Sequence, residues 1–138
     1  MKIKTDFVTN SSSTCFIVMK KGDFTLESFI KASGIEDKSA FRKIFTRLYE
    51  SLSNNLEPLD VGVKRHRWYK SESNIEDFIN SVFSKETWQR IVKAREAGFE
   101  VFIGDLSSDE NTIETFFCCT SFVIESENLI IDATCDGW

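Results

Sequence analysis

A run of short polar side chains occupies residues 9–14, directly before an apolar segment. Hydroxyl and amide groups of this kind can hydrogen-bond a phosphate or another chain, with free backbone N–H groups assisting. The run contains neither Gly nor Lys, so it is not a Walker A loop. Such side chains also bond their own neighbouring backbone, and we favour this self-satisfied loop. The residues that would contact a ligand are Asn10, Ser11, Ser12 and Ser13.

A second cluster, at residues 64–70, combines four basic side chains with one histidine and two aromatic rings. Positive charge beside a flat ring is what phosphate attraction and base stacking require. On a net-acidic chain, an edge strand protected by its charges explains the cluster equally well, so we expect no nucleic-acid partner. The candidate ligand contacts in this segment are Arg65, His66, Arg67 and Trp68.

His66 is the only histidine, so any Ser–His or Cys–His catalytic pair must include it. A nucleotide- or phosphate-binding protein, or a small hydrolase, would need the loop at 9–14 to meet His66 in one pocket. The sequence lacks G-x-S-x-G, H-E-x-x-H and G-x-G-x-x-G, the common signatures of hydrolases, zinc proteases and dinucleotide-binding proteins. We therefore favour a protein without enzymatic activity, and we assign no catalytic residue and no cofactor.

Four cysteines are too few for a disulfide scaffold, and we expect them to be free thiols. Cys15 and Cys135, near predicted strand ends, could join His66 and one of the adjacent pair Cys118 and Cys119 around a tetrahedral zinc ion. Adjacent cysteines rarely bind one ion together, and buried free cysteine is an ordinary core residue. We therefore assign no metal.

The 138 residues are enough for one domain, which we expect to span residues 1–138. With 41% hydrophobic residues and 13 phenylalanines, the composition is that of a globular chain with a real core. No apolar run approaches the roughly 20 residues that span a bilayer, and no secretory signal is apparent, so we expect a cytoplasmic protein without a membrane segment. From residue 100 onward the chain has nine carboxylates and no Lys or Arg, which could attract a basic partner.

Apolar spacing predicts most of the elements. Strands are expected at 16–20 and 99–104, and a closing hairpin joins 122–126 to 129–133 through Glu127 and Asn128, with Asn able to take a positive φ. Helices are expected between a Thr25 or Asp23 cap and Gly34, over 41–52, and from a Ser73 capping box to Gly98 with a break beside Ser84. A short helix is expected within 107–117, and 56–70 is expected to be a connector with a short edge strand.

The resulting order, β-ααα-β-α-ββ, predicts an α+β fold. We expect a mixed sheet of about four strands, with helices packed mainly on one face. If the strand at 99–104 lies parallel to the strand at 16–20, the three intervening helices form a right-handed crossover. The apolar stripe at 41–52 is expected to bury against this sheet.

The block Phe7-Val-Thr-Asn-Ser-Ser-Ser13 resembles the N-terminus of a diffuse set of small uncharacterised prokaryotic and phage-borne proteins. In those relatives the run is often all serine, whereas Thr14 and Cys15 interrupt it here, and 122–131 is similar to the closing hairpin of some members. The resemblance covers about a quarter of the chain and implies no activity. We expect a small cytoplasmic binding or protein-interaction module with a protein partner.

Overall fold

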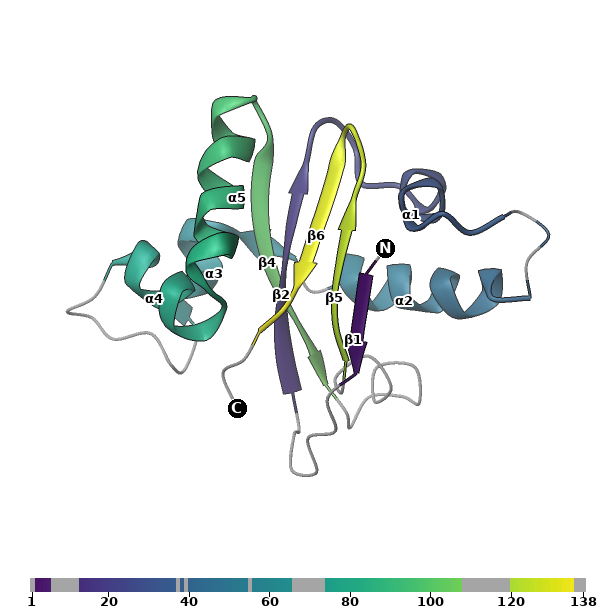
Figure 1. Ribbon diagram of the computed structural model, residues 1–138, viewed down its shortest axis with the longest axis horizontal. Helices are drawn as coiled ribbons and strands as arrows, with labels where there is room; N and C mark the ends of the chain where they lie inside the picture. Colours follow the sequence, from purple (N-terminus) through teal and green to yellow (C-terminus); the bar gives the residue numbers. More distant parts are fainter. Residues whose placement is uncertain are drawn as a thin grey trace.

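The computed structural model describes residues 2–5, 13–36, 38, 40–54, 56–65, 74–107 and 120–135. These residues form an α+β fold, as expected (Figure 1). The strands are β1 (Lys2–Thr5), β2 (Ser13–Lys20), β3 (Glu57–Pro58), β4 (Glu100–Ser107), β5 (Thr120–Glu125) and β6 (Leu129–Ala133). The helices are α1 (Leu26–Ser33), α2 (Arg42–Asn54), α3 (Leu59–Arg65), α4 (Ile75–Val82) and α5 (Lys85–Glu96).

The strands form one sheet in the order β1-β5-β6-β2-β4-β3, in which β3 is only two residues long. Every pairing is antiparallel, so the prediction of a mixed sheet is wrong. The chain leaves β2 at Lys20 and enters β4 at Glu100, directly opposite it in the register. Because the intervening helices return the chain to the same end of the sheet, they do not form a parallel crossover.

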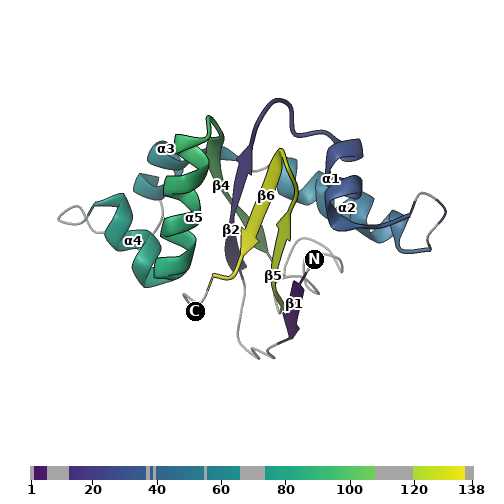
Figure 2. The same cartoon turned by 45° about the horizontal axis from the view of Figure 1, so that its top comes forward.

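β2 lies inside the sheet between β6 and β4, and its residues from Cys15 to Met19 are all buried. Phe16 and Val18 face a core cluster that includes residues of α1 and α2, whereas Ile17 and Met19 face a cluster that includes residues of α3, α4 and α5. Helices therefore cover both faces of the sheet, and the prediction of one covered face is wrong (Figures 1 and 2). The uninterrupted apolar run is the pattern of a strand covered on both sides.

Four helices lie where the apolar spacing places them. α1 begins after Thr25, whose hydroxyl accepts a hydrogen bond from the Ser28 backbone N–H, and it ends at Gly34 with φ 75°. The break near Ser84 separates α4 from α5, and the Ser84 hydroxyl caps α5 by accepting from the Thr87 N–H at 3.1 Å. Local capping chemistry therefore sets these boundaries.

Several local predictions need correction. α4 is capped by Asn74 and not by Ser73, because the Asn74 side-chain oxygen accepts from the Asp77 N–H at 2.8 Å. α3 occupies part of the segment expected to be a connector, although its edge strand is present as β3. β1 was not expected at all. The helix expected within 107–117 lies mostly outside the described residues, and residue 107 itself ends β4.

The closing hairpin is confirmed by the antiparallel pairing of β5 with β6. Its turn is closed by the Ser126 N–H, which donates to the Leu129 carbonyl oxygen at 2.7 Å. Asn128 does not take the expected positive φ, since within the described residues only glycines do so. The connection therefore uses ordinary right-handed or extended backbone instead of a mirror-image turn.

Gly62 in α3 lies directly against β4. A Cβ atom at this position would collide with Cγ2 of Ile103 on β4. Isoleucine is stiff at χ1, so its methyl group cannot easily turn away. The absence of a side chain at Gly62 thus allows α3 to lie directly on β4.

We predict that Gly62→Ala destabilises the protein by about 1–3 kcal/mol through overpacking. In an unobstructed helix the same change stabilises by roughly 0.5–1 kcal/mol, so the sign is diagnostic. Urea unfolding measures the change, and Ile103→Ala supplies the second arm of a double-mutant cycle. In the Ile103→Ala background, Gly62→Ala should lower the free energy of unfolding by much less, because the colliding methyl group is gone. A Gly62→Ala variant as stable as the parent would refute the contact.

Candidate functional site

Most of the sequence-predicted ligand contacts lie outside the described residues. These are Asn10, Ser11, Ser12, His66, Arg67 and Trp68, together with the metal candidates Cys118 and Cys119. The meeting of the 9–14 loop with His66, which the hydrolase and nucleotide-binding alternative requires, is therefore not tested by the described residues. Of the remaining candidates, Ser13 is the first residue of β2 and pairs with Ser107 of β4. Arg65 is the last residue of α3.

Arg65 is partnered within the protein. Its Nη1 atom donates to Glu57 Oε1 of β3 at 2.6 Å, and the pair lies at the exposed edge of the sheet. Arg65 and Lys64 occupy the last turn of α3, where positive charge is favourable to the helix dipole. The expectation that an edge strand carries this part of the cluster is wrong, because residues 59–65 are helical. The described part of the basic cluster has a structural explanation.

The acidic C-terminal stretch does not form a separate surface in the described residues. Glu100 lies opposite Lys20 in the strand register, and Arg90 of α5 reaches both Glu125 at 3.8 Å and Asp132 at 2.8 Å. The fold brings basic residues from the first hundred positions beside acidic residues of the last forty. Segregation of charge along the sequence is thus partly cancelled in space.

Asp132 of β6 is the only fully buried acidic residue in the described part of the chain. Its Oδ2 atom accepts hydrogen bonds from Thr87 Oγ1 and Arg90 Nη1 of α5, both at 2.8 Å. Its Oδ1 atom accepts from the Thr134 N–H at 3.1 Å and the Thr134 hydroxyl at 2.5 Å. Four donors satisfy both carboxylate oxygens, so this group holds α5 on the sheet and is not available as a catalytic base.

Sequence reasoning missed this network, although one signal was present. Asp132 follows the apolar run Leu129-Ile-Ile in the second strand of the predicted hairpin. A carboxylate at such a position must find donors on the element packed above it.

Cys15 and Cys135 lie side by side in the core cluster under α3, α4 and α5. The Cys15 thiol donates to the Cys135 sulfur at an Sγ–Sγ distance of 2.9 Å, and no disulfide joins the two residues. The hydrogen bond to Cys135, followed by burial, raises the pKa of Cys15 well above its usual range. The other zinc candidates, His66, Cys118 and Cys119, lie outside the described residues, so the zinc alternative stays a prediction.

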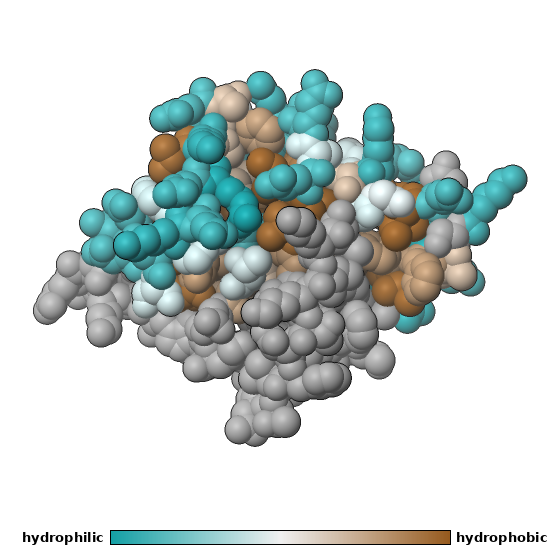
Figure 3. All heavy atoms as spheres, in the orientation of Figure 1, coloured by the Kyte–Doolittle hydropathy of each residue, from teal (hydrophilic) through white to brown (hydrophobic). Residues whose placement is uncertain are grey.

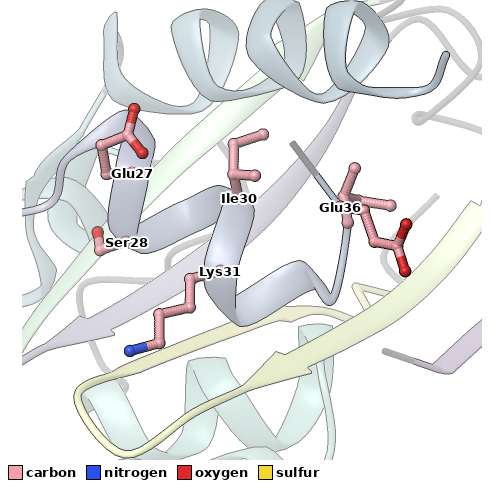
Figure 4. Close-up of a pocket in the computed structure, with 6 residues that line it drawn as sticks. Glu27, Ser28, Ile30, Lys31 and Glu36 are labelled. Carbon is pink, nitrogen blue, oxygen red and sulfur yellow. The ribbon is translucent and has the colours of Figure 1, made fainter. Parts of the chain in front are cut away.

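A solvent-open pocket of ≈ 540 Å³ lies against α1. Figure 4 shows Ile30 between the carboxylates of Glu27 and Glu36, with Lys31 extending from the same helix. Ile30 is almost fully buried and forms the floor together with the half-buried Ile35. The pocket therefore has an apolar base and a rim of mixed charge.

α2 presents apolar side chains to solvent close to this pocket. Phe45, Leu48 and Leu52 of its predicted stripe are buried, as expected. Phe41 and Ile44 are not, with exposed fractions of 59% and 36%, because the stripe is wider than the face that meets the sheet. Phe41 directly precedes α2 and Ile44 lies in its first turn, three residues further on. Brown apolar atoms reach the surface at this side of the molecule in Figure 3.

An ion pair connects the two features. Arg42 of α2 donates to Glu27 Oε1 on the pocket rim at 3.4 Å. We call the combined area, formed by Glu27, Ile30, Lys31, Ile35, Glu36, Phe41 and Ile44, the α1–α2 surface. Its residue types can hold an apolar segment of a partner between charged groups. Ser28 also lines the pocket, and its hydroxyl donates to the Thr25 carbonyl oxygen at 2.8 Å.

Comparison with protein-family models, curated proteins and solved structures finds no match. No helix in the described residues is both long enough and apolar enough to cross a membrane.

We predict that Arg90→Met destabilises the protein by about 2–4 kcal/mol, because it leaves the buried Asp132 carboxylate without its cation. Arg95→Met is the matched control on the same helix. It removes an exposed ion pair to Asp60 at 3.3 Å and should cost under about 1 kcal/mol. Guanidinium unfolding of both variants measures the difference. Equal losses would show that the Asp132 network is not anchoring α5.

Proposed function

We propose that this protein is a non-enzymatic protein-interaction module that binds its partner through the α1–α2 surface. The observation that carries the proposal is the exposure of Phe41 and Ile44 at the start of α2, beside a pocket with an isoleucine floor. Contiguous exposed apolar groups with a polar rim are typical of protein-binding surfaces. Aromatic anchors near charged residues are the usual centres of binding energy.

The energetics favour a partner at this position. Fully covering a phenylalanine or isoleucine side chain gains roughly 1.5–3 kcal/mol relative to leaving it in water. The 59% of Phe41 and the 36% of Ile44 that folding leaves exposed retain part of this gain for a complex. A complex would gain this free energy with little rearrangement of α2, because the buried side chains of Phe45, Leu48 and Leu52 already hold the helix in place.

The charges indicate the chemistry of the partner. Lys43 and Arg47 are exposed on α2, and Arg47 lies one turn beyond Ile44 on the same side of the helix. An amphipathic segment with apolar anchors and acidic flanks would place its apolar side chains on Phe41, Ile44 and the pocket. Its carboxylates would then face the two basic residues of α2.

Site-specific photo-crosslinking tests the proposal. The whole protein carries a photoreactive phenylalanine analogue at Ile44 in its cells of origin. The matched control carries it at Val92 of α5, which has nearly the same exposed fraction, 37%, on the opposite side of the sheet. We expect a discrete heterologous adduct from position 44 and not from position 92, identified by mass spectrometry. Charge reversal at Lys43 and Arg47 should weaken it.

Equal labelling from both positions, or no adduct at position 44, would contradict the proposal. An adduct containing two copies of this chain would replace it with self-association.

A stability comparison separates binding from folding. Phe41→Ala should change the free energy of unfolding by less than about 0.5 kcal/mol, because the side chain is mostly in water. Phe45→Ala, one turn further along α2, should cost about 3–5 kcal/mol, because its ring lies in the core 6.1 Å from that of Phe29. Thermal and urea unfolding measure both variants. A large loss from Phe41→Ala would mean that Phe41 serves the fold.

A further inference from the structure

The two buried thiols, Cys15 and Cys135, come from segments that are far apart in the sequence. Cys15 belongs to β2, and Cys135 follows the end of β6 by two residues, 120 positions away in sequence. Their sulfur atoms are 2.9 Å apart, about 0.9 Å more than a disulfide bond. Because β6 ends at Ala133, no strand pairing fixes the backbone at Cys135, and a movement of this size does not require β2 or β6 to break.

We propose that Cys15 and Cys135 form a reversible disulfide when a small hydroperoxide, such as hydrogen peroxide, oxidises them. The disulfide would join the chain beyond β6 to the beginning of β2. This modification site is independent of the α1–α2 surface, which lies on the other side of the sheet.

Burial decides which oxidant fits and which sulfur reacts first. The exposed fractions are 1% for Cys15 and 7% for Cys135, so a bulky disulfide reagent is excluded while a molecule of the size of water can enter. Because Cys135 is the more exposed of the two residues, peroxide reaches its sulfur first, and Cys15 is the resolving thiol.

The reaction balances in two steps. The Cys135 sulfur attacks one oxygen of hydrogen peroxide, the O–O bond breaks, and the product is a sulfenic acid and one water. The Cys15 sulfur then attacks the Cys135 sulfur, the S–S bond forms, the S–O bond breaks, and a second water leaves with the Cys15 proton. Two thiols lose two electrons and two protons, and the peroxide is reduced to two waters. Unfolding exposes the disulfide, and a dithiol reductant then reverses the change by thiol–disulfide exchange.

The physical consequence is a constraint on the unfolded chain. A cross-link that closes a loop of this length restricts the denatured ensemble strongly. We expect the oxidised protein to melt about 5–10 °C above the reduced protein.

The test uses the full chain with Cys118→Ser and Cys119→Ser, so that only the two proposed thiols remain. Reduced protein is treated with hydrogen peroxide at neutral pH, then analysed by intact mass, by peptide mapping without reductant, and by thermal unfolding. We expect a mass decrease of two hydrogen atoms, a cross-linked peptide joining Cys15 to Cys135, the higher melting temperature, and reversal by dithiothreitol. A further Cys135→Ser change should abolish all four.

Two results would overturn the proposal. One is a mass that stays constant or rises by added oxygen, with both thiols still unpaired after unfolding. The other comes from the unsubstituted chain, where peroxide treatment followed by mapping should again join Cys15 to Cys135. Exclusive linkage through Cys118 or Cys119 there would show that the buried pair is not the oxidised site.

Discussion

Burial of β2 on both faces is the constraint on which the rest of the structure depends. An interior strand with apolar side chains at every position from Cys15 to Met19 must be covered above and below. One layer comes from α1 and α2 and the other from α3, α4 and α5, which separates the core into two clusters that share the sheet. β2 also lies at the centre of the strand pairing, because β4 and β6 both pair with it in antiparallel orientation.

Double coverage also determines where polar groups can lie. A carboxylate inside the sheet, such as Asp132, exists only because α5 supplies Thr87 and Arg90 directly above it. The paired thiols are the other polar feature of this layer, and they lie where β2 begins and β6 has ended. The Asp132 carboxylate and the two thiols are therefore enclosed in the protein, and the chemical reactivity of each group depends on its immediate neighbours.

The opposite layer has the reverse character. α1 and α2 bury their inner residues but leave Phe41 and Ile44 in solvent beside an open pocket. A helix covers only the part of the sheet that its own width allows, so an apolar stripe wider than that contact remains accessible. This geometry supports the proposed partner binding on this face of the sheet. The proposed disulfide between Cys15 and Cys135 lies on the opposite face and is independent of it.

Local chemistry in the sequence determined the elements and several of their ends. Apolar spacing placed α1, α2, α4, α5, β2 and β4, while Thr25, Gly34 and Ser84 marked helix ends, because caps and periodicity act within a few residues. The tertiary structure alone decided strand direction, the two-sided coverage, the approach of α3 at Gly62, the partners of Asp132, and the meeting of Cys15 with Cys135. Each depends on contacts between residues far apart in the chain, and no local pattern specifies which distant segment will supply them.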